Sequence, residues 1–276
     1  MDRREFLKTS AVVASFIATS PLDILGEAKQ SRVYVAAGKD AIYRLFEKSH
    51  LLQKVVTSGM RVLIKPNFSF ANHPEAGTTT KPEIVRAIAE MCVQCGAREV
   101  RVVDNTIRSP KLCLERTGIR DALRGLKKVK ISIPKKKREF KEVRIPQGRS
   151  LKAVEVAKEC LESDLVINVP VAKSHSATIV SIGLKNLMGL IFDRWSFHSK
   201  YDLDQAIADL ATAVKPALTV VDLTRCITRG GPSGPGKVEE AGLVALSSDP
   251  VAADAFAITQ YRWWGRWYEP KQVRHI

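Results

Sequence analysis

Lysine, asparagine and histidine residues follow apolar runs at two places in the sequence. Lys65 and Asn67 come directly after the run at 62–64, and Lys173 and His175 come shortly after the run at 165–167. Lysine neutralises carboxylates and phosphates, and an imidazole titrates near neutral pH, so His175 is a candidate general base, metal ligand or anion contact. A solvated loop histidine is the plainer alternative. The pattern predicts a site for a small anionic ligand, with Lys173 and His175 as catalytic candidates.

Two threonines stand just before a predicted helix start. Thr79 and Thr80 precede the sequence Lys-Pro-Glu at 81–83, where proline in the first turn and the apolar rows that follow predict a helix. Helix capping is the plainer role and is expected for one of them. Hydroxyl groups beside a helix N-terminus also suit a phosphate or carboxylate, because the helix dipole favours negative charge there. Thr79 and Thr80 are therefore anion-binding candidates, although no Walker pattern accompanies them.

Two aspartates are candidates for binding a metal or orienting a substrate hydroxyl. Asp104 follows the apolar run at 100–103, and Asp254 lies inside the apolar stretch 251–257. An Asx-turn or a helix cap is the commoner role for an aspartate after a strand. A carboxylate among apolar side chains needs a partner, so Asp254 is expected to contact a donor.

Lys185 and Asn186 interrupt an otherwise apolar segment at 178–191. The segment predicts a helix that is buried on most sides and forms the floor of the pocket, with Lys185 as a further catalytic candidate and Asn186 as an anion contact. A buried lysine needs a partner, which would be Asp254, Asp104 or a bound anion. A surface lysine on a half-buried helix is the alternative.

Apolar strands alternate with helical patterns from residue 32 onward. The expected strands are 32–36, 61–64, 100–103, 129–133, 165–167, 218–221 and 243–246, and the expected helices are 40–57, 82–95, 110–125, 151–162, 178–191, 203–214 and 250–262. This order predicts a three-layer α/β fold with a largely parallel sheet and helices on both faces. Ligands bind such sheets at the carboxyl ends of the strands, where most of the candidate residues lie.

The first 28 residues resemble a twin-arginine export signal. Arg3 and Arg4 precede Phe6-Leu7-Lys8 and a short apolar run at 11–18. That run is too short for a permanent membrane span, and an amphipathic helix is the alternative. We therefore expect an exported, periplasmic or otherwise extracytoplasmic protein that meets the twin-arginine translocation machinery, followed by one domain at 32–276.

The chain is strongly basic, with a formal net charge of +15 over 276 residues. The stretch 124–149 holds eleven basic residues against two acidic ones, and we expect it to be an exposed insertion or ribbon of the domain. An anionic partner is indicated, and export makes nucleic acid an unlikely one.

The five cysteines are too few for a disulfide scaffold, and no iron–sulfur run is present. Cys92 and Cys95 are separated by two residues on the predicted helix at 82–95. Small core side chains are the expected role for both, and a redox pair is the alternative.

An ordered series of motifs makes the chain resemble the DUF362 family. The motifs are 63–67 (Leu-Ile-Lys-Pro-Asn), 79–87 (Thr-Thr-Lys-Pro-Glu-Ile-Val-Arg-Ala), 96–100 (Gly-Ala-Arg-Glu-Val), 169–175 (Val-Pro-Val-Ala-Lys-Ser-His), 183–190 (Gly-Leu-Lys-Asn-Leu-Met-Gly-Leu) and 249–255 (Asp-Pro-Val-Ala-Ala-Asp-Ala). The resemblance implies a domain and a set of polar residues, and it implies no reaction or cofactor.

Two classes of function fit these features. The first is an exported enzyme that acts on a small anionic substrate, with Lys173, His175 and Lys185 in catalytic roles. The second is an extracytoplasmic binding or accessory protein that uses the same pocket without catalysis. The sequence names neither a metal nor a cofactor.

Overall fold

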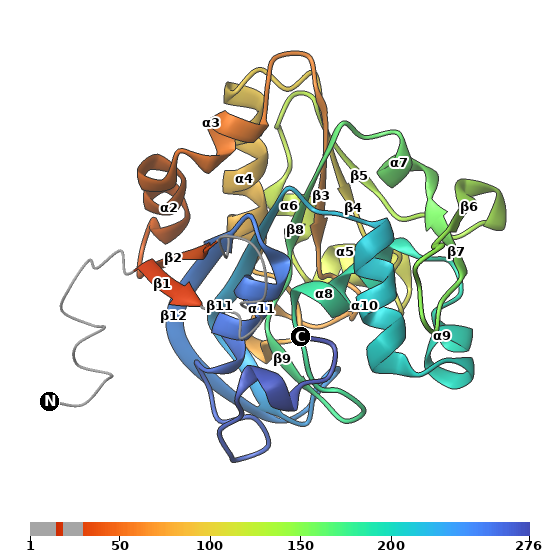
Figure 1. Ribbon diagram of the computed structural model, residues 1–276. Helices are drawn as coiled ribbons and strands as arrows, with labels where there is room; N and C mark the ends of the chain where they lie inside the picture. Colours follow the sequence, from red (N-terminus) through yellow and green to blue (C-terminus); the bar gives the residue numbers. More distant parts are fainter. Residues whose placement is uncertain (1–14, 19–29) are drawn as a thin grey trace, which may run out of the picture.

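The computed structural model describes residues 15–18 and 30–276, and an eight-stranded sheet forms its centre (Figure 1). Across the sheet the strands run β1 (Ser15–Ala18), β2 (Ser31–Ala37), β12 (Lys237–Ser247), β11 (Leu218–Arg229), β8 (Leu165–Val169), β3 (Arg61–Pro66), β4 (Glu99–Val103) and β5 (Val129–Ser132). The five strands from β11 to β5 are parallel, and β12, β2 and β1 are each antiparallel to their neighbours. The carboxyl ends of the parallel strands therefore meet at one edge.

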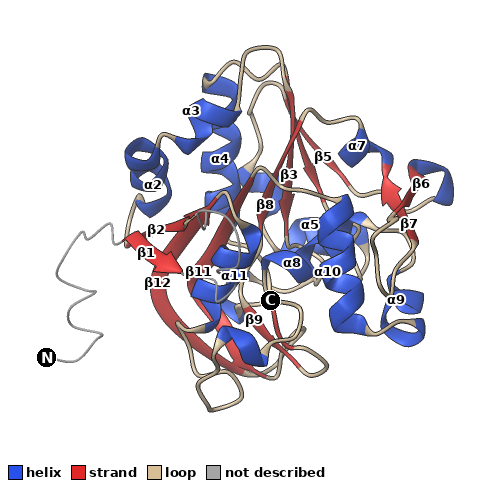
Figure 2. Cartoon of the chain, in the orientation of Figure 1, coloured by secondary structure: helices blue, strands red, loops and turns tan. Residues whose placement is uncertain are grey.

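Helices cover both faces of the sheet, which confirms the expected three-layer α/β architecture (Figure 2). Successive side chains of a strand point to opposite faces, so Val62 and Ile64 enter one core and Leu63 enters another. One face carries α2 (Ala41–Ser49), α3 (Leu51–Val55), α4 (Pro82–Gln94), α5 (Pro110–Arg116) and α6 (Ile119–Ala122). The other carries α8 (Gly183–Asn186), η3 (Leu187–Leu190), α9 (Arg194–Lys200), α10 (Leu203–Ala213) and α11 (Pro250–Ile258).

The prediction of one helix over 178–191 is wrong. The segment begins with β10 (Ile179–Ser181), which pairs antiparallel with β9 (Lys173–His175), and continues as the single turn α8 and the 3₁₀ turn η3. Ile179 has a positive φ of 64° and Ile182 an extended ψ of −139°, and neither fits a continuous helix. The segment is apolar all round because the sheet, α10 and α11 enclose it, not because it is a long helix.

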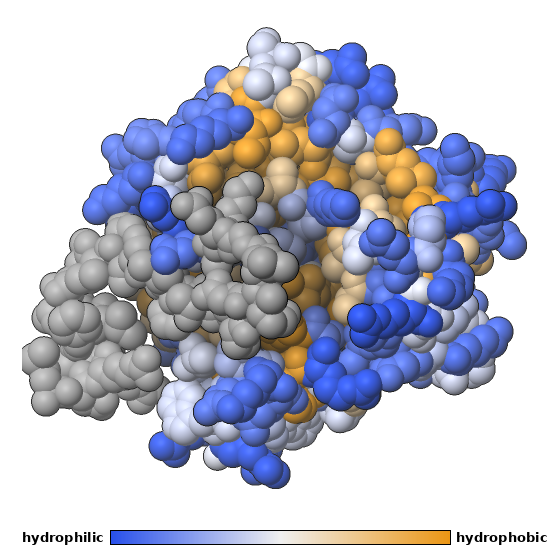
Figure 3. Space-filling model, viewed as in Figure 1, coloured by the Kyte–Doolittle hydropathy of each residue, from blue (hydrophilic) through white to orange (hydrophobic). Residues whose placement is uncertain are grey.

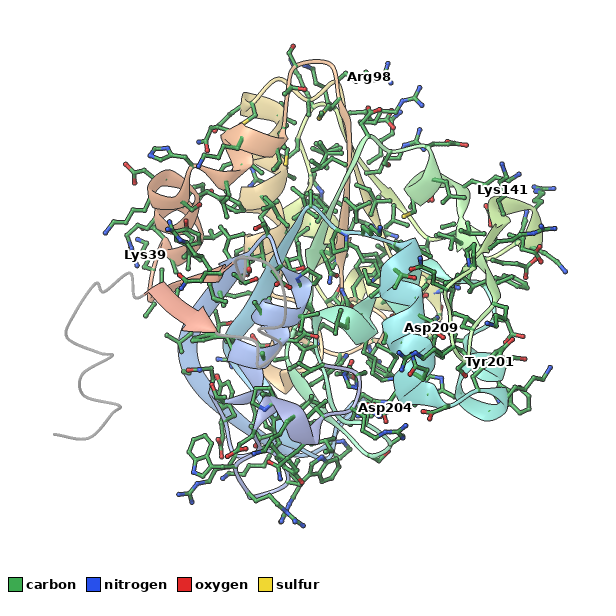
Figure 4. All side chains as sticks on the ribbon, viewed as in Figure 1. Lys39, Arg98, Lys141, Tyr201, Asp204 and Asp209 are labelled. Atoms are coloured by element: carbon green, nitrogen blue, oxygen red, sulfur yellow. The ribbon has the colours of Figure 1, made fainter. Side chains whose placement is uncertain are left out.

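The prediction of a helix over 151–162 is also wrong. Residues 153–157 alternate as Ala-Val-Glu-Val-Ala and form strand β7 (Ala153–Ala157), followed by the single turn α7 (Lys158–Leu161). β7 pairs antiparallel with β6 (Phe140–Arg144), and Lys141 lies on this small ribbon at the outside of the molecule (Figure 4). The basic stretch 124–149 thus contributes an edge strand of the main sheet, the short turn η2 (Lys137–Glu139) and one strand of the ribbon.

Two other predicted helices are each divided in two. His50, with φ 53°, separates α2 from α3, and Gly118, with φ 71°, separates α5 from α6. Short turns at η1 (Pro74–Ala76) and η4 (Pro270–Gln272) complete the described elements.

Hydrophilic side chains surround the rim of the molecule, with apolar side chains showing between them (Figure 3). Among the described helices, none is long and apolar enough to cross a membrane. The expected export signal at 1–28 lies outside the described residues except for β1.

Candidate functional site

A buried ion pair lies beneath the ends of β3 and β4. The Lys65 Nζ is 3.1 Å from Asp104 Oδ1, and both side chains are completely buried. The other carboxylate oxygen of Asp104 accepts hydrogen bonds from the Phe68 backbone N–H and the Ser69 hydroxyl, each at 2.9 Å. Burial lowers the pKa of Lys65, while the charge of Asp104 opposes that effect. Asp104 is thus engaged by its own neighbours and serves as the internal counter-ion of Lys65.

The Asn186 amide joins the ends of three segments. Its oxygen accepts from Asn67 Nδ2 at 2.9 Å and from Lys65 Nζ at 3.4 Å, and its Nδ2 donates to the Lys65 carbonyl at 3.0 Å and to Asn168 Oδ1 at 2.8 Å. Asn168 in turn donates to the Gly183 carbonyl at 2.8 Å. Our sequence analysis missed Asn168, although an asparagine inside the apolar strand Leu-Val-Ile-Asn-Val was a signal for it.

Lys173 lies beside this network without a carboxylate partner in the described part of the chain. Its Nζ donates to Asn67 Oδ1 at 3.0 Å and to the Thr78 carbonyl at 2.8 Å, and it stands 4.9 Å from the centre of the Phe70 ring. Burial lowers the pKa of Lys173 to about 7; Asp104 raises it, and the charges of Lys65 and Lys185 lower it further. The amine therefore titrates near neutral pH.

Lys185 is also buried, with 5 % of its surface exposed. Its Nζ lies 3.3 Å from His198 Nε2 and 3.5 Å from the Met188 sulfur. Neither Asp254 nor Asp104 contacts it, so the expected internal carboxylate partner is wrong, and the bound anion stays a prediction. Burial lowers the pKa of Lys185 to about 8; Asp204 opposes the shift.

The hydrogen bonds of the two histidines fix their tautomers. His175 Nδ1 lies 3.2 Å from the Ala177 backbone N–H, which can only donate, so the proton of the neutral ring is on Nε2. His198 Nδ1 lies 2.8 Å from the Arg194 carbonyl, which can only accept, so here the proton is on Nδ1 and Nε2 accepts from Lys185. Burial lowers the pKa of His175 to about 3 and, with the charge of Lys185, lowers that of His198.

One cavity of about 70 Å³ lies at the carboxyl edge of the sheet, and Asn67 and Asn186 line it together with the two lysines and two histidines just described. We call it the cationic pocket, after the basic residues Lys173, His175, Lys185, Arg194 and His198 in its wall. Arg194 is partly buried, and its Nη1 donates to the Ser69 hydroxyl at 3.5 Å. Burial lowers the pKa of Arg194, while the charge of Asp104 opposes that effect. The sequence analysis missed Arg194 and His198, which are four residues apart on α9 and so share one helix face.

Five candidate residues do not line the cationic pocket: Lys65 and Asp104 of the buried ion pair, Thr79, Thr80 and Asp254. The Thr80 hydroxyl accepts from the Asn67 backbone N–H at 2.8 Å and donates to the Val169 carbonyl at 2.7 Å, so it ties the loop after β3 to β8. Thr79 lines a separate cavity of about 460 Å³ together with Lys81 and Asp222. Its buried hydroxyl has no hydrogen-bond partner among the described residues.

Asp254 is a helix cap and not a pocket residue. Its two carboxylate oxygens accept from the backbone N–H groups of Gly183 and Leu184 at 2.7 and 2.8 Å. Burial raises the pKa of Asp254 to about 7 in spite of these hydrogen bonds. The carboxylate thereby fixes the start of α8, the turn that carries Lys185 and Asn186.

Neither a cysteine site nor a clustered metal site is found in the part of the chain that is described. Cys92 is fully buried, and burial raises its pKa to about 12; Cys95 is less buried, and both thiols are free. No three histidine, cysteine, aspartate or glutamate side chains of the described residues gather in a way that could hold a metal ion. The donors of the cationic pocket instead suit an anion.

Comparisons with known proteins agree with the sequence motifs. The family model described as "Domain of unknown function (DUF362)" matches residues 62–259. The thylakoid-associated protein sll1697 of Synechocystis sp. is 30% identical over 212 residues, which cover 74% of this chain and 63% of that protein. The chain therefore spans less than two thirds of the length of this relative. The lactate racemase apoprotein of Thermoanaerobacterium thermosaccharolyticum aligns with a TM-score of 0.44 and 12% identity, over 69% of this chain and 48% of that one.

Proposed function

The chain belongs to the DUF362 family, and we propose that it binds a small anion in the cationic pocket. The observation that carries this proposal is the gathering of three cationic side chains around one cavity, two of them buried and one partly buried, with no ion-pair partner among the described residues. Lys173, Lys185 and Arg194 make no ion pair with any described residue, and the nearby Asp104 is paired with Lys65. Burying an unpaired charge costs free energy, and a bound anion would offset that cost by pairing with the cations.

The hydrogen-bonding character of the pocket supports the same class of ligand. Lys173, Lys185 and Arg194 offer N–H groups, and the tautomer of His175 offers Nε2–H. Such a wall suits a ligand that only accepts hydrogen bonds, such as a carboxylate or an oxyanion. In this proposal His175 is a neutral donor, because its low pKa leaves it uncharged at neutral pH.

The volume of the cationic pocket suits a small ligand. A cavity holds roughly one water-sized atom per 10–15 Å³, so about 70 Å³ admits about five. Acetate, glycolate and inorganic phosphate are of that size.

Isothermal titration calorimetry with sodium acetate, sodium glycolate and sodium phosphate tests the proposal. We expect at least one of these anions to bind the wild-type protein, with an affinity at least tenfold weaker in Arg194→Met. Arg120→Met removes the charge of an exposed arginine and should bind as the wild type does. Absence of binding to all three anions, or equal binding by Arg194→Met, would contradict an anion site in this pocket.

A catalytic role is favoured over a purely binding one by a second observation. Two lysines in one pocket, Lys173 and Lys185, have pKa values of about 7 and 8, so each exists partly as a neutral amine near neutral pH. Enzymes use desolvated lysines of this kind as bases and nucleophiles.

We also propose that the chain is exported by the twin-arginine route. The support is the arrangement of Arg3, Arg4 and the following apolar run, which belongs to the sequence alone. Replacing both arginines by lysine keeps the charge and should leave the protein in the cytoplasm when cell fractions are compared by immunoblot. Unchanged export of that variant would contradict the proposal.

A further inference from the structure

We propose that Lys185 forms a covalent imine with a small carbonyl compound that carries a carboxylate, and that His198 is the base that activates it. The inference rests on the proposed function, because the cationic pocket supplies the site for the carboxylate. It adds the class of substrate, a small oxo acid, and the residue that reacts with it.

The geometry around Lys185 is that of an activated nucleophile. Its Nζ lies 3.3 Å from His198 Nε2, the ring nitrogen that carries no proton. The Arg194 carbonyl holds the opposite nitrogen at 2.8 Å and so fixes both the tautomer and the orientation of the ring. A nucleophile, a base within reach and a third group that orients the base form the usual signature of covalent catalysis by a side chain.

His198 can also hold the proton that Lys185 gives up. Lys185 is buried, whereas His198 is an exposed residue of α9 whose ring reaches the pocket. Because solvent reaches this residue, the imidazolium is less costly there than a second charge at the buried amine would be. The lowered pKa of Lys185 works in the same direction, because burial already favours the neutral amine.

Lys173 is less suited to this role. Two of its N–H groups donate to Asn67 Oδ1 and the Thr78 carbonyl, and no imidazole or carboxylate of the described residues accepts from it. Its remaining N–H is free for a ligand oxygen. Lys173, Arg194 and the Nε2–H of His175 are then available to bind the carboxylate of the oxo acid while Lys185 faces its carbonyl carbon.

The step is balanced without any oxidant or reductant. His198 Nε2 takes a proton from the Lys185 ammonium, and the free electron pair of Nζ attacks the carbonyl carbon as the C=O π electrons move to oxygen. The imidazolium returns its proton to that oxygen to give a carbinolamine. A second Nζ proton then leaves by way of His198 to the hydroxyl, which departs as water, and the positively charged iminium stays on Lys185.

Reductive trapping tests the inference. Purified protein is incubated at neutral pH with sodium glyoxylate and sodium cyanoborohydride, and adducts are counted by intact-mass spectrometry and located by peptide mapping. We expect one dominant adduct, on Lys185. Lys185→Arg should lose it, and Lys54→Arg, which changes an exposed lysine, should keep it.

The role of His198 has its own readout. His198→Gln should slow adduct formation at least tenfold at pH 7 and by much less at pH 10, where Lys185 loses its proton unaided. An equal slowing at both pH values would indicate a merely structural role for His198 and overturn that part of the inference. Thermal unfolding of each variant verifies that it is folded.

The outcomes separate this inference from the proposed function. Glyoxylate that binds in calorimetry but leaves no adduct on Lys185, or adducts on exposed lysines alone, would overturn the imine while anion binding stands. Failure of glyoxylate, acetate, glycolate and phosphate to bind at all would overturn both.

Discussion

At the scale of single residues, the site is a set of cations in which Lys65 has a carboxylate partner, while Lys173, Lys185 and Arg194 have none among the described residues. Lys65 has Asp104, and its pKa is lowered by burial against that attraction. Lys185 has a neutral imidazole and a thioether as its neighbours. The same residue type in the same region is therefore structural in one case and available to a ligand in the other.

Lys185→Met is expected to stabilise the unliganded protein at neutral pH. The folded pKa of about 8 lies below the value of 10.5 for a free lysine, so between these values the unfolded state binds more protons and stability rises with pH. Below about pH 8 the wild type carries the full penalty, up to about 3 kcal/mol. The advantage of the variant should shrink toward pH 10.5 in urea unfolding series.

Lys215→Met is the matched control, because Lys215 is exposed. Its free energy of unfolding should differ from the wild-type value by the same small amount at every pH. A Lys185→Met protein that is less stable than wild type at pH 7 would show that Lys185 has a stabilising partner.

Part of the site follows from sequence at this scale. Asn67, Lys173, His175, Lys185 and Asn186 do line one cavity, because each lies at or near the carboxyl end of a parallel strand or in the crossing segment beside it. Asp254 could be recognised as a buried carboxylate, but its partners are the backbone N–H groups of Gly183 and Leu184. A contact with backbone N–H groups cannot be predicted from residue types, because every residue except proline has such a group.

At the scale of elements, η3 presses its backbone directly onto the buried ion pair. A Cβ atom on Gly189 would lie 2.6 Å from Lys65 Nζ and would also overlap Asp104 Oδ1. Glycine is required here for close approach, not for an unusual φ. The turn therefore closes over Lys65 and Asp104 and seals them from water.

Gly189→Ala is expected to lower stability by about 2–4 kcal/mol, because the added methyl group must displace a buried charge pair. Gly125→Ala is the comparison: nothing lies within 4 Å of a Cβ there, and only the positive φ of 82° opposes it. Its cost should stay near 1 kcal/mol, the penalty of a left-handed alanine. Equal losses in chemical denaturation would contradict the crowding at Gly189.

The elements that sequence predicts well are the strands and the longer amphipathic helices. α4 and α10 lie close to the expected 82–95 and 203–214, because each has a clear apolar face and a proline or aspartate at its start. The segment 178–191 has no polar face, so periodicity cannot distinguish a helix from an enclosed irregular chain. α9 is too short to leave a periodic pattern.

At the scale of the whole molecule, the formal net charge is +15, and much of it comes from the stretch 124–149, with eleven basic and two acidic residues. Within that stretch the residues are not equivalent. Lys135, Lys136, Lys137 and Arg138 are all exposed residues, but the Lys135 ammonium also donates to Asn105 Oδ1 at 2.9 Å and to the Thr106 carbonyl. Surface charge and structural charge thus stand side by side in sequence.

Reversing Lys136, Lys137 and Arg138 together to glutamate should lower the salt concentration at which the protein elutes from a cation exchanger. Stability should change by less than about 1 kcal/mol, since exposed ion pairs contribute little. Lys135→Glu alone should change the elution less and the stability more. We expect a loss of about 1–3 kcal/mol in the free energy of unfolding, because the new carboxylate would face two acceptor oxygens. Similar stability of both variants would contradict the distinction.

The hydrogen bonds of the pocket also determine at which stage of chain synthesis the pocket can form. Asn67 contacts Lys173 and Asn186 across 106 and 119 positions of the chain, and Asp254 holds Gly183 from 71 positions further on. During synthesis on a ribosome, Asn67 is therefore added to the chain long before Asp254, whose carboxylate holds α8 in place. Contacts so distant in sequence form slowly, because the entropy of closing a long loop is lost before the contact contributes any stabilisation. If the pocket binds an anion as proposed, the nascent chain should acquire that affinity only after α11 has emerged.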